Sequence, residues 1–132
     1  MSQEAVTIER LEGGAFWRVA LGGSKGNVID AALTAALTEA FAEAGRTPAL
    51  KAILLEGQGK HFSFGASVQE HLPGQVEGML CRFHALLLAL VDCAVPLLGV
   101  VRGQCLGGGL ELVSLSHRIF AAPDARLGQP EI

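Results

Sequence analysis

Three consecutive glycines, Gly107, Gly108 and Gly109, stand between two apolar segments of this chain. Residues 95–101 are typical of a buried strand, and residues 110–115 are typical of the start of a helix. The glycines therefore mark a turn from a strand into a helix. The first amides of a helix have no partner within it, the helix dipole adds partial positive charge there, and glycine lets another oxygen approach closely. The pattern predicts a pocket for a negative oxygen, either of a bound anion or of a reaction intermediate.

Glu111 follows Gly108 by three residues, which places it on the same helical face one turn further along. A carboxylate beside an amide-lined oxygen site is suited to proton transfer next to a developing oxyanion. The same residues are equally compatible with a tight packing turn that needs small side chains. Two phosphate-binding motifs are excluded, because a P-loop requires Lys where Gly109 stands and a dinucleotide-binding loop requires Gly where Leu112 stands.

Length and composition exclude several classes of protein. The 132 residues fit one domain, half of them are hydrophobic, and 17% are charged with a net charge of −3. Because no basic stripe is present, we expect no nucleic-acid partner. The longest apolar run, residues 85–91, is too short to span a membrane, and the N-terminal residues lack the pattern of a secretory signal. We therefore expect a cytoplasmic protein without a membrane segment.

The cysteines and histidines give no sign of a metal centre or a disulfide. Cys81, Cys93 and Cys105 are far apart and form no CxxC pair, and the four histidines form no His-x-x-x-His pair. We interpret the cysteines as small buried apolar residues.

Strand and helix patterns alternate along the chain. Strands are predicted over residues 6–11, 16–21, 50–56, 97–101 and 117–122, and helices over residues 31–44, 68–72 and 76–92. The first two strands form a hairpin, and the later alternation predicts an α/β fold with a largely parallel sheet. The helix over residues 76–92 is apolar around most of its circumference, so we expect burial on most of its sides.

A long glycine-bearing loop, residues 57–67, follows the strand over residues 50–56. In α/β sheets, ligands bind beyond the carboxyl ends of the strands. This loop and the glycine triplet both follow strands, so we expect them to meet on one side of the sheet and form a site. A glycine-rich loop without any binding role is the alternative, which these residues leave open.

Four segments, taken together in this order and spacing, resemble the crotonase superfamily of enoyl-CoA hydratases and isomerases. They are Asn27-Val-Ile-Asp30, Phe62-Ser-Phe-Gly-Ala66, Gly103-x-x-x-Gly-Gly-Gly-x-Glu111 and Gly128-Gln-Pro-Glu-Ile132. The resemblance covers nearly the whole chain but only about the first half of a usual family member. It implies one domain, residues 1–132, with the N-terminal part of a spiral of ββα units and without the helical C-terminal region that builds trimers.

The resemblance also implies the site. Family members bind acyl-CoA thioesters, and the thioester oxygen would lie between the backbone N–H groups of Ala66 and Gly108. The two glutamates of the hydratases match Glu111 and Glu131, and the presence of both favours addition of water to a C=C bond. Neither a metal nor a redox cofactor is implied, and the expected assembly is a homo-oligomer, a trimer or a dimer of trimers. The remaining residues expected to bind substrate or CoA are Phe64, Gly65, Ser67, Val68 and Gly107.

Some positions depart from the usual family pattern. Ser67 stands where Asp is common, Phe64 where a small residue is common, and His117 where Asp is frequent. The segment from Gly65 to His71 is similar to the branch that hydrates cyclic dienoyl-CoA thioesters such as cyclohexa-1,5-diene-1-carbonyl-CoA.

Other activities are compatible with the same resemblance. They are those of an enoyl-CoA isomerase, an acyl-CoA hydrolase, and a non-catalytic fragment that binds CoA or assembles with partners. Since Glu131 is the penultimate residue, we expect these 132 residues alone to bind CoA esters weakly, to self-associate and to turn over poorly or not at all.

Overall fold

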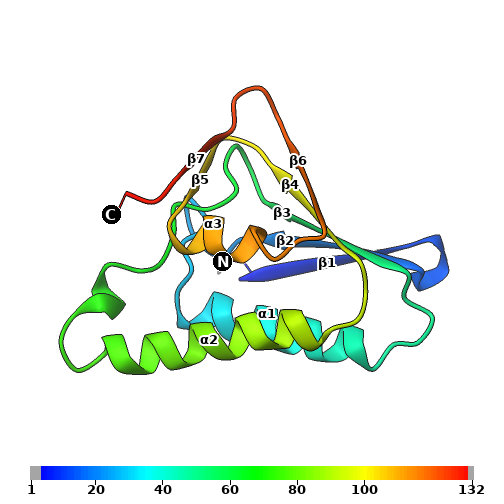
Figure 1. Ribbon diagram of the computed structural model, residues 1–132, viewed down its shortest axis with the longest axis horizontal. Coiled ribbons are helices and arrows are strands. Elements are labelled where there is room, and N and C mark those ends of the chain that lie inside the picture. Colours follow the sequence, from blue (N-terminus) through cyan, green and yellow to red (C-terminus); the bar gives the residue numbers. More distant parts are fainter. Residues whose placement is uncertain (1–3, 131–132) are drawn as a thin grey trace.

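The computed structural model describes residues 4–130 (Figure 1). Its strands are β1 (Val6–Leu11), β2 (Phe16–Leu21), β3 (Ala52–Gly57), β4 (Leu97–Val101), β5 (Gln104–Leu106), β6 (Arg118–Ala121) and β7 (Arg126–Gly128). Its helices are α1 (Ala31–Gly45), α2 (Val76–Asp92) and α3 (Gly108–Val113), and its 3-10 segments are η1 (Glu12–Gly14) and η2 (Gln69–His71). The predicted α/β alternation is therefore present.

Two sheets organise the strands. The larger has the order β1-β2-β3-β4-β6, in which β1 and β2 are antiparallel and all other neighbours are parallel. β5 and β7 form a separate parallel pair. The parallel arrangement brings the carboxyl ends of β3 and β4 to the same edge of the sheet, and the segments that follow them form the site described below.

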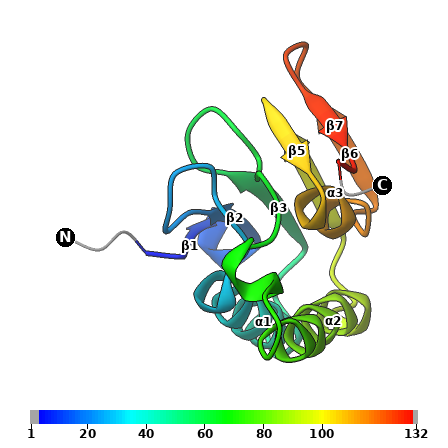
Figure 2. The same cartoon turned by 90° about the vertical axis from the view of Figure 1, so that its left-hand side faces the viewer.

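The core lies between one face of the larger sheet and helices α1 and α2, which run side by side (Figures 1 and 2). Alternation along the strands produces this face, since Trp17 and Val19 of β2 are buried while Arg18 between them is exposed. Asp30 begins α1 as predicted, and its side chain accepts a hydrogen bond of 2.9 Å from the amide of Leu33.

The region around the glycine triplet differs from the sequence prediction. The short strand β5 lies between β4 and the glycines, so the turn into the helix follows β5 and not the strand over residues 97–101. A three-residue strand is too short for a recognisable period of two. α3 begins at Gly108 and ends at Val113, so it includes two of the glycines and stops before the end of the apolar segment.

The prediction that α2 is buried on most sides is wrong for this chain. Within residues 4–130, α2 packs along one side only. Its buried residues are Met79, Phe83, Leu86 and Leu90. Its exposed large apolar side chains are Leu80, Leu88 and Val91. Cys81 on the same helix is also exposed, so the interpretation of the cysteines as buried residues holds for Cys93 and Cys105 only. None of the helices in the described part of the chain is long and apolar enough to cross a membrane.

Candidate functional site

The loop after β3 and the segment after β4 run alongside each other, as the sequence predicted. The carbonyl of Gln104 accepts hydrogen bonds from the amides of Phe62 and Ser63 at 3.0 and 3.1 Å, and the carbonyl of Ser63 accepts one from the amide of Leu106 at 3.0 Å. The ring Nδ1 of His61 adds another bond by accepting from the amide of Gln104 at 3.0 Å. These contacts hold the two segments in a fixed register.

Two glycines allow this close approach. A Cβ on Gly65, whose φ is +102°, would lie 3.0 Å from the carbonyl oxygen of Leu106. A Cβ on Gly109 would lie 2.8 Å from the Cβ of Ser63. Because real Cβ atoms are rarely this close to such atoms, a side chain at either position would push the two segments apart.

The backbone amides of Ala66 and Gly108 lie close together where the two segments meet, and both residues line one pocket. The amide nitrogen of Ala66 lies 3.7 Å from the position that a Cβ on Gly108 would occupy. Among the hydrogen bonds of residues 4–130, none has the amide of Ala66 or that of Gly108 as its donor. Gly108 is the first residue of α3, where a free amide is the rule. Both N–H groups are therefore without an acceptor among residues 4–130, and we interpret them as candidate donors to a bound oxygen.

A pocket of about 490 Å³ opens at these amides. Its lining residues are Ala66, His71, Met79, Leu80, Phe83, Gly108, Glu111 and Gln129. Glu111 is exposed on α3, and its amide bonds to the carbonyl of Gly107 at 3.0 Å. The pocket thus combines an apolar wall from α2, two free amides and one carboxylate.

The second predicted glutamate, Glu131, lies outside the described residues. The segment that precedes it is held against the glycine triplet. The amide of Gly107 donates to the carbonyl of Gly128 at 2.9 Å, and Nε2 of Gln129 donates to the carbonyl of Gly107 at 3.2 Å. Gln129 itself lines the pocket, so the chain is at the pocket two residues before Glu131.

Asn27 anchors the loop that carries Ala66. Its side chain is buried, and Nδ2 donates towards the carbonyls of Gln58, His61 and Phe62 at 3.0, 3.0 and 3.1 Å. The carbonyl of Asn27 in turn accepts from Oγ of Ser63 at 2.8 Å. Sequence reasoning assigned Asn27 no role beyond its place in a motif, although Asn is one of the few residues that tolerate the left-handed backbone it adopts here, with φ of +50°.

The residues predicted to bind substrate or CoA lie around the amides, but the 490 Å³ pocket is lined by others. Ser67 donates its amide to the carbonyl of Ile29 at 3.2 Å, and Val68 is 81% exposed. Phe64 is half exposed and packs edge-on against the ring of His61, with 4.8 Å between the centroids. A second pocket of about 460 Å³ lies next to this aromatic pair. Its lining residues are Ser24, Lys25, Gly26, Asn27, Gln58, Gly59, Lys60 and His61.

The environment of Cys105 on β5, shortly before the glycine triplet, disfavours a reactive thiolate. It is buried on β5, and burial raises the pKa of its thiol to about 11. The thiol therefore stays protonated near neutral pH, and a protonated thiol is a poor nucleophile. Within residues 4–130, no group of three His, Cys, Asp or Glu side chains is arranged to hold a metal ion.

Comparison with known proteins identifies the family. The family model described as enoyl-CoA hydratase/isomerase matches residues 19–132. The chain belongs to this family. It is 50% identical over 119 residues to the cyclohexa-1,5-dienecarbonyl-CoA hydratase of Thauera aromatica, a match that covers 90% of this chain and 46% of that protein. The chain thus spans about half the length of this curated relative.

A second relative carries a different activity in its name. The chain is 35% identical over 100 residues to the (7aS)-7a-methyl-1,5-dioxo-2,3,5,6,7,7a-hexahydro-1H-indene-carboxyl-CoA hydrolase of Rhodococcus jostii (strain RHA1), covering 73% of this chain and 39% of that one. The structure of DspI from Pseudomonas aeruginosa superposes with a TM-score of 0.90 at 24% identity, covering 99% of this chain and 51% of DspI. This likeness concerns the fold alone, and together with the family match it confirms the predicted crotonase-like α/β architecture.

Proposed function

We propose that this protein adds water across the C=C bond of an α,β-unsaturated acyl-CoA thioester. The observation that carries the proposal is the pair of free amides, Ala66 and Gly108, facing one pocket together with the carboxylate of Glu111. Hydration of an enoyl thioester needs donors for an oxygen that becomes negative and a carboxylate that moves protons. The match to the enoyl-CoA hydratase/isomerase family supports the same chemistry.

In the proposed reaction, the thioester oxygen accepts hydrogen bonds from both amides. The oxygen of water bonds to the β-carbon, the π electrons move towards the thioester, and an enolate forms. The amides stabilise this charge, and losing one such donor typically costs about 2.7–4 kcal/mol of activation free energy. The enolate then collapses as a proton reaches the α-carbon, so that one molecule of water is added in total.

Two glutamates carry the proton transfers in this proposal. One takes a proton from the attacking water, and the other helps to deliver a proton to the α-carbon. Glu111 lines the pocket, and the chain that leads to Glu131 is bound to Gly107 through Gly128. Positioned acid–base groups of this kind typically contribute about 10²–10⁴-fold to a rate.

The CoA part of the substrate has its own proposed contacts. Lys25 and Lys60 line the 460 Å³ pocket beside Phe64, and their charges suit the phosphate groups of CoA. Phe64, Gly65, Ser67 and Val68 flank Ala66 along the chain and Gly107 directly precedes Gly108, so we assign these five residues to contacts with the acyl and pantetheine portions. The reaction requires neither a metal nor a redox cofactor in this scheme.

A cyclic dienoyl thioester is our proposed substrate. The segment from Gly65 to His71 is similar to the cyclic dienoyl-CoA branch, and the Thauera aromatica relative named for cyclohexa-1,5-dienecarbonyl-CoA is 50% identical. We therefore propose cyclohexa-1,5-diene-1-carbonyl-CoA as the preferred substrate. The family resemblance further supports a trimer or a dimer of trimers as the working assembly.

The test is a hydration assay with a panel of CoA esters. Loss of absorbance at the enoyl-thioester band should be fastest with the cyclic dienoyl-CoA and slower with straight-chain enoyl-CoA esters. The matched control is Glu111→Gln, which keeps the size of the side chain but removes the base. Light scattering on the same preparation measures the assembly.

Acyl-CoA hydrolysis is the second candidate, since the Rhodococcus jostii relative is named as a hydrolase. Hydrolysis releases a free thiol of CoA, whereas hydration keeps the thioester intact. A thiol-specific reagent in the same assay therefore separates the two reactions. Isomerisation would move the double bond without adding the mass of water. CoA-ester binding without any of these products would support a non-catalytic CoA-binding protein.

A further inference from the structure

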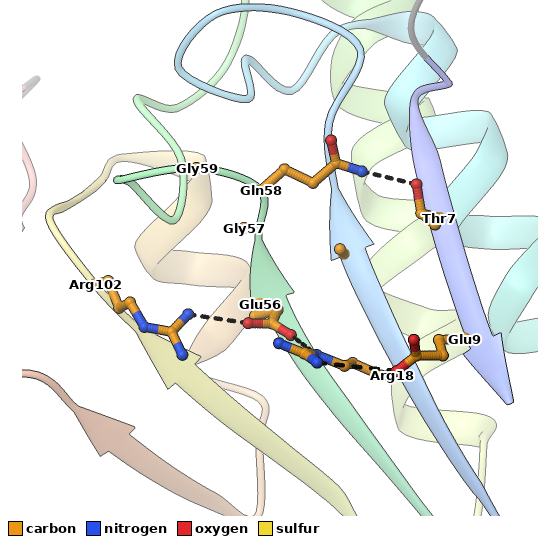
Figure 3. A pocket seen from close by; sticks show the side chains of 9 residues that line it. Thr7, Glu9, Arg18, Glu56, Gly57, Gln58, Gly59 and Arg102 are labelled. Carbon is orange, nitrogen blue, oxygen red and sulfur yellow. Dashed lines mark hydrogen bonds and ion pairs between the residues drawn. The ribbon is translucent and has the colours of Figure 1, made fainter. Parts of the chain in front are cut away.

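A buried carboxylate holds two arginines on the face of the sheet away from α1 and α2 (Figure 3). The side chain of Glu56 is only 6% exposed, whereas those of Arg18 and Arg102 are 50% and 47% exposed. Nη1 of Arg102 donates to Oε1 of Glu56 at 2.9 Å, and Nε of Arg18 donates to Oε2. On the other side of Arg18, Oε1 of Glu9 lies 3.9 Å from Nη1 of Arg18. The side chains of β1, β2, β3 and the residue after β4 therefore form a row of alternating charge, which consists of Glu9, Arg18, Glu56 and Arg102.

The Glu56–Arg102 pair lies where the backbone pairing between β3 and β4 ends. The ladder of these strands runs from Ile53 and Leu97 to Leu55 and Gly99. Beyond it, β3 leads into the loop that carries Ala66 and β4 leads into the segment that carries Gly108. The ion pair links the two chains just after the ladder ends, before backbone hydrogen bonds resume between Phe62 and Arg102.

Arg102 is tied to both segments at once. Its side chain holds Glu56 at the end of β3, and its carbonyl accepts a hydrogen bond of 2.9 Å from the amide of Phe62 in the loop. The next residue, Gly103, has φ of +58°, and a Cβ there would overlap the ring of His61 and the carbonyl of Lys60. The chain therefore has little freedom at this junction, and a shift of Arg102 is transmitted to both segments.

We propose that Glu56 is a positioning residue that, through Arg102, sets the separation of the Ala66 and Gly108 amides. The inference rests on the proposed function, because the separation matters only if both amides bind one oxygen. Such a site must be held to within about 0.5 Å, and the two contacts of Arg102, with the Glu56 carboxylate and with the Phe62 amide, are the first restraints on the two chains after the ladder ends. Arg18 binds the same carboxylate but extends from β2, which leads to neither amide, so it balances charge without setting the separation.

The test compares four variants of the purified protein: Glu56→Gln, Arg102→Met, Arg102→Lys and, as the matched control, Arg18→Met. Arg18→Met removes an ion pair of similar exposure from the same carboxylate. Each variant is assayed for kcat and KM on the best substrate of the panel. The second readout is the red shift of a bound CoA ester whose chromophore is conjugated to the thioester carbonyl, because the shift reports how strongly the two amides polarise that carbonyl.

We expect Glu56→Gln and Arg102→Met to lower kcat by about 10- to 100-fold with little change in KM. Both should reduce the red shift, Arg102→Lys should recover part of each loss, and Arg18→Met should match the wild type. Wild-type kcat and red shift in Arg102→Met would overturn the inference, as would equal losses in Arg18→Met. If Glu56→Gln and both Arg102 variants all failed to fold, the pair would hold the fold and not the amide separation, which also overturns it. No turnover and no red shift in the wild type would instead overturn the proposed function.

Discussion

The amide nitrogen of Ala66 lies 3.7 Å from the position of a Cβ on Gly108, and that position also lies 3.6 Å from the side chains of Ile29 and Phe83. All three distances are ordinary van der Waals contacts, so the space beside Gly108 can hold a methyl group. In the proposed reaction this same space receives the thioester oxygen.

We therefore predict that Gly108→Ala folds normally and fails as a catalyst. The methyl group would occupy the position of the oxyanion, and kcat should fall by about 10²–10³-fold, the usual loss when one oxyanion donor is removed. Gly109→Ala is the contrasting variant, because its Cβ would lie 2.8 Å from the Cβ of Ser63 and should lower the melting temperature. Thermal unfolding and initial rates measure both effects, and a Gly108→Ala protein with wild-type kcat would contradict the assignment of this amide.

The carboxylate of Glu111 gives a second prediction. Glu111→Gln keeps the size of the side chain and its place in the pocket but cannot accept a proton, so kcat should fall by about 10²–10⁴-fold. Because the residue is exposed, stability should change little. CoA-ester binding, measured by calorimetry, should stay near the wild-type value. Undiminished turnover would place the proton transfer on another group.

Most of the fold could be predicted from sequence because its signals are long or local. The apolar periods of α1 and α2, the Asp30 cap and the alternating strands each depend on a few neighbouring residues. The convergence of the loop and the glycine triplet also followed from parallel strand order alone. The short strand β5 was not predicted because three residues are too few to show an alternating pattern. The exposed side of α2 was not predicted because the hydrophobicity of a helix does not reveal how many other elements pack against it.

The supporting contacts of the site could not be predicted in the same way. Asn27 bonds to carbonyls more than thirty residues away, and Glu56 meets Arg102 across 46 positions. Each residue is unremarkable in its own segment, so only the folded chain brings the partners together. The glycines were easier to interpret because their backbone freedom is an intrinsic property. Glu131 lies outside the described residues, and its role stays a prediction.

The stability of the protein should depend on pH through Glu56. Burial raises the pKa of this carboxyl, but hydrogen bonds from Arg18 and Arg102 outweigh burial and leave the pKa below its ordinary value of 4.5. A carboxyl whose pKa is lowered by folding stabilises the protein above its unfolded-state pKa, and this contribution disappears as pH falls through the folded-state pKa. We predict that Glu56→Gln lowers the unfolding free energy by about 1–3 kcal/mol near neutral pH.

The difference in unfolding free energy between the wild type and Glu56→Gln should stay constant above pH 4.5 and shrink below it. Urea unfolding across this range measures it. A difference that grows as the pH falls would contradict the lowered pKa of Glu56.

The three cysteines should differ sharply in reactivity. Cys81 is exposed on α2, whereas Cys93 and Cys105 are buried, and the pKa of the Cys105 thiol is raised to about 11. At a mildly alkaline pH, iodoacetamide should therefore modify Cys81 alone in the native protein and all three cysteines in denaturant. Intact mass and peptide mapping count and locate the labels. Rapid native labelling of Cys105 would show that β5 and the adjoining amide segment open easily.

The last prediction concerns Asn27, whose Nδ2 faces the carbonyls of Gln58, His61 and Phe62. Asn27→Asp has nearly the same shape and also tolerates a positive φ, so the change isolates the donor group. The new carboxylate would turn an acceptor towards three other acceptors in a buried site. We expect the unfolding free energy near neutral pH to fall by about 3–5 kcal/mol, the cost of a buried charge without a partner.

Asn27→Gly is the control for this substitution. Glycine adopts the same backbone conformation at no steric cost, and it removes the donor without adding a charge. The unfolding free energy of Asn27→Gly should therefore fall less than that of Asn27→Asp, by about 1–3 kcal/mol, because the carbonyls lose their donor but face no new charge. Urea unfolding at one pH ranks the three proteins. If Asn27→Asp came within about 0.5 kcal/mol of the wild type, a range usual for surface changes, the three carbonyl contacts would not hold the loop that carries Ala66.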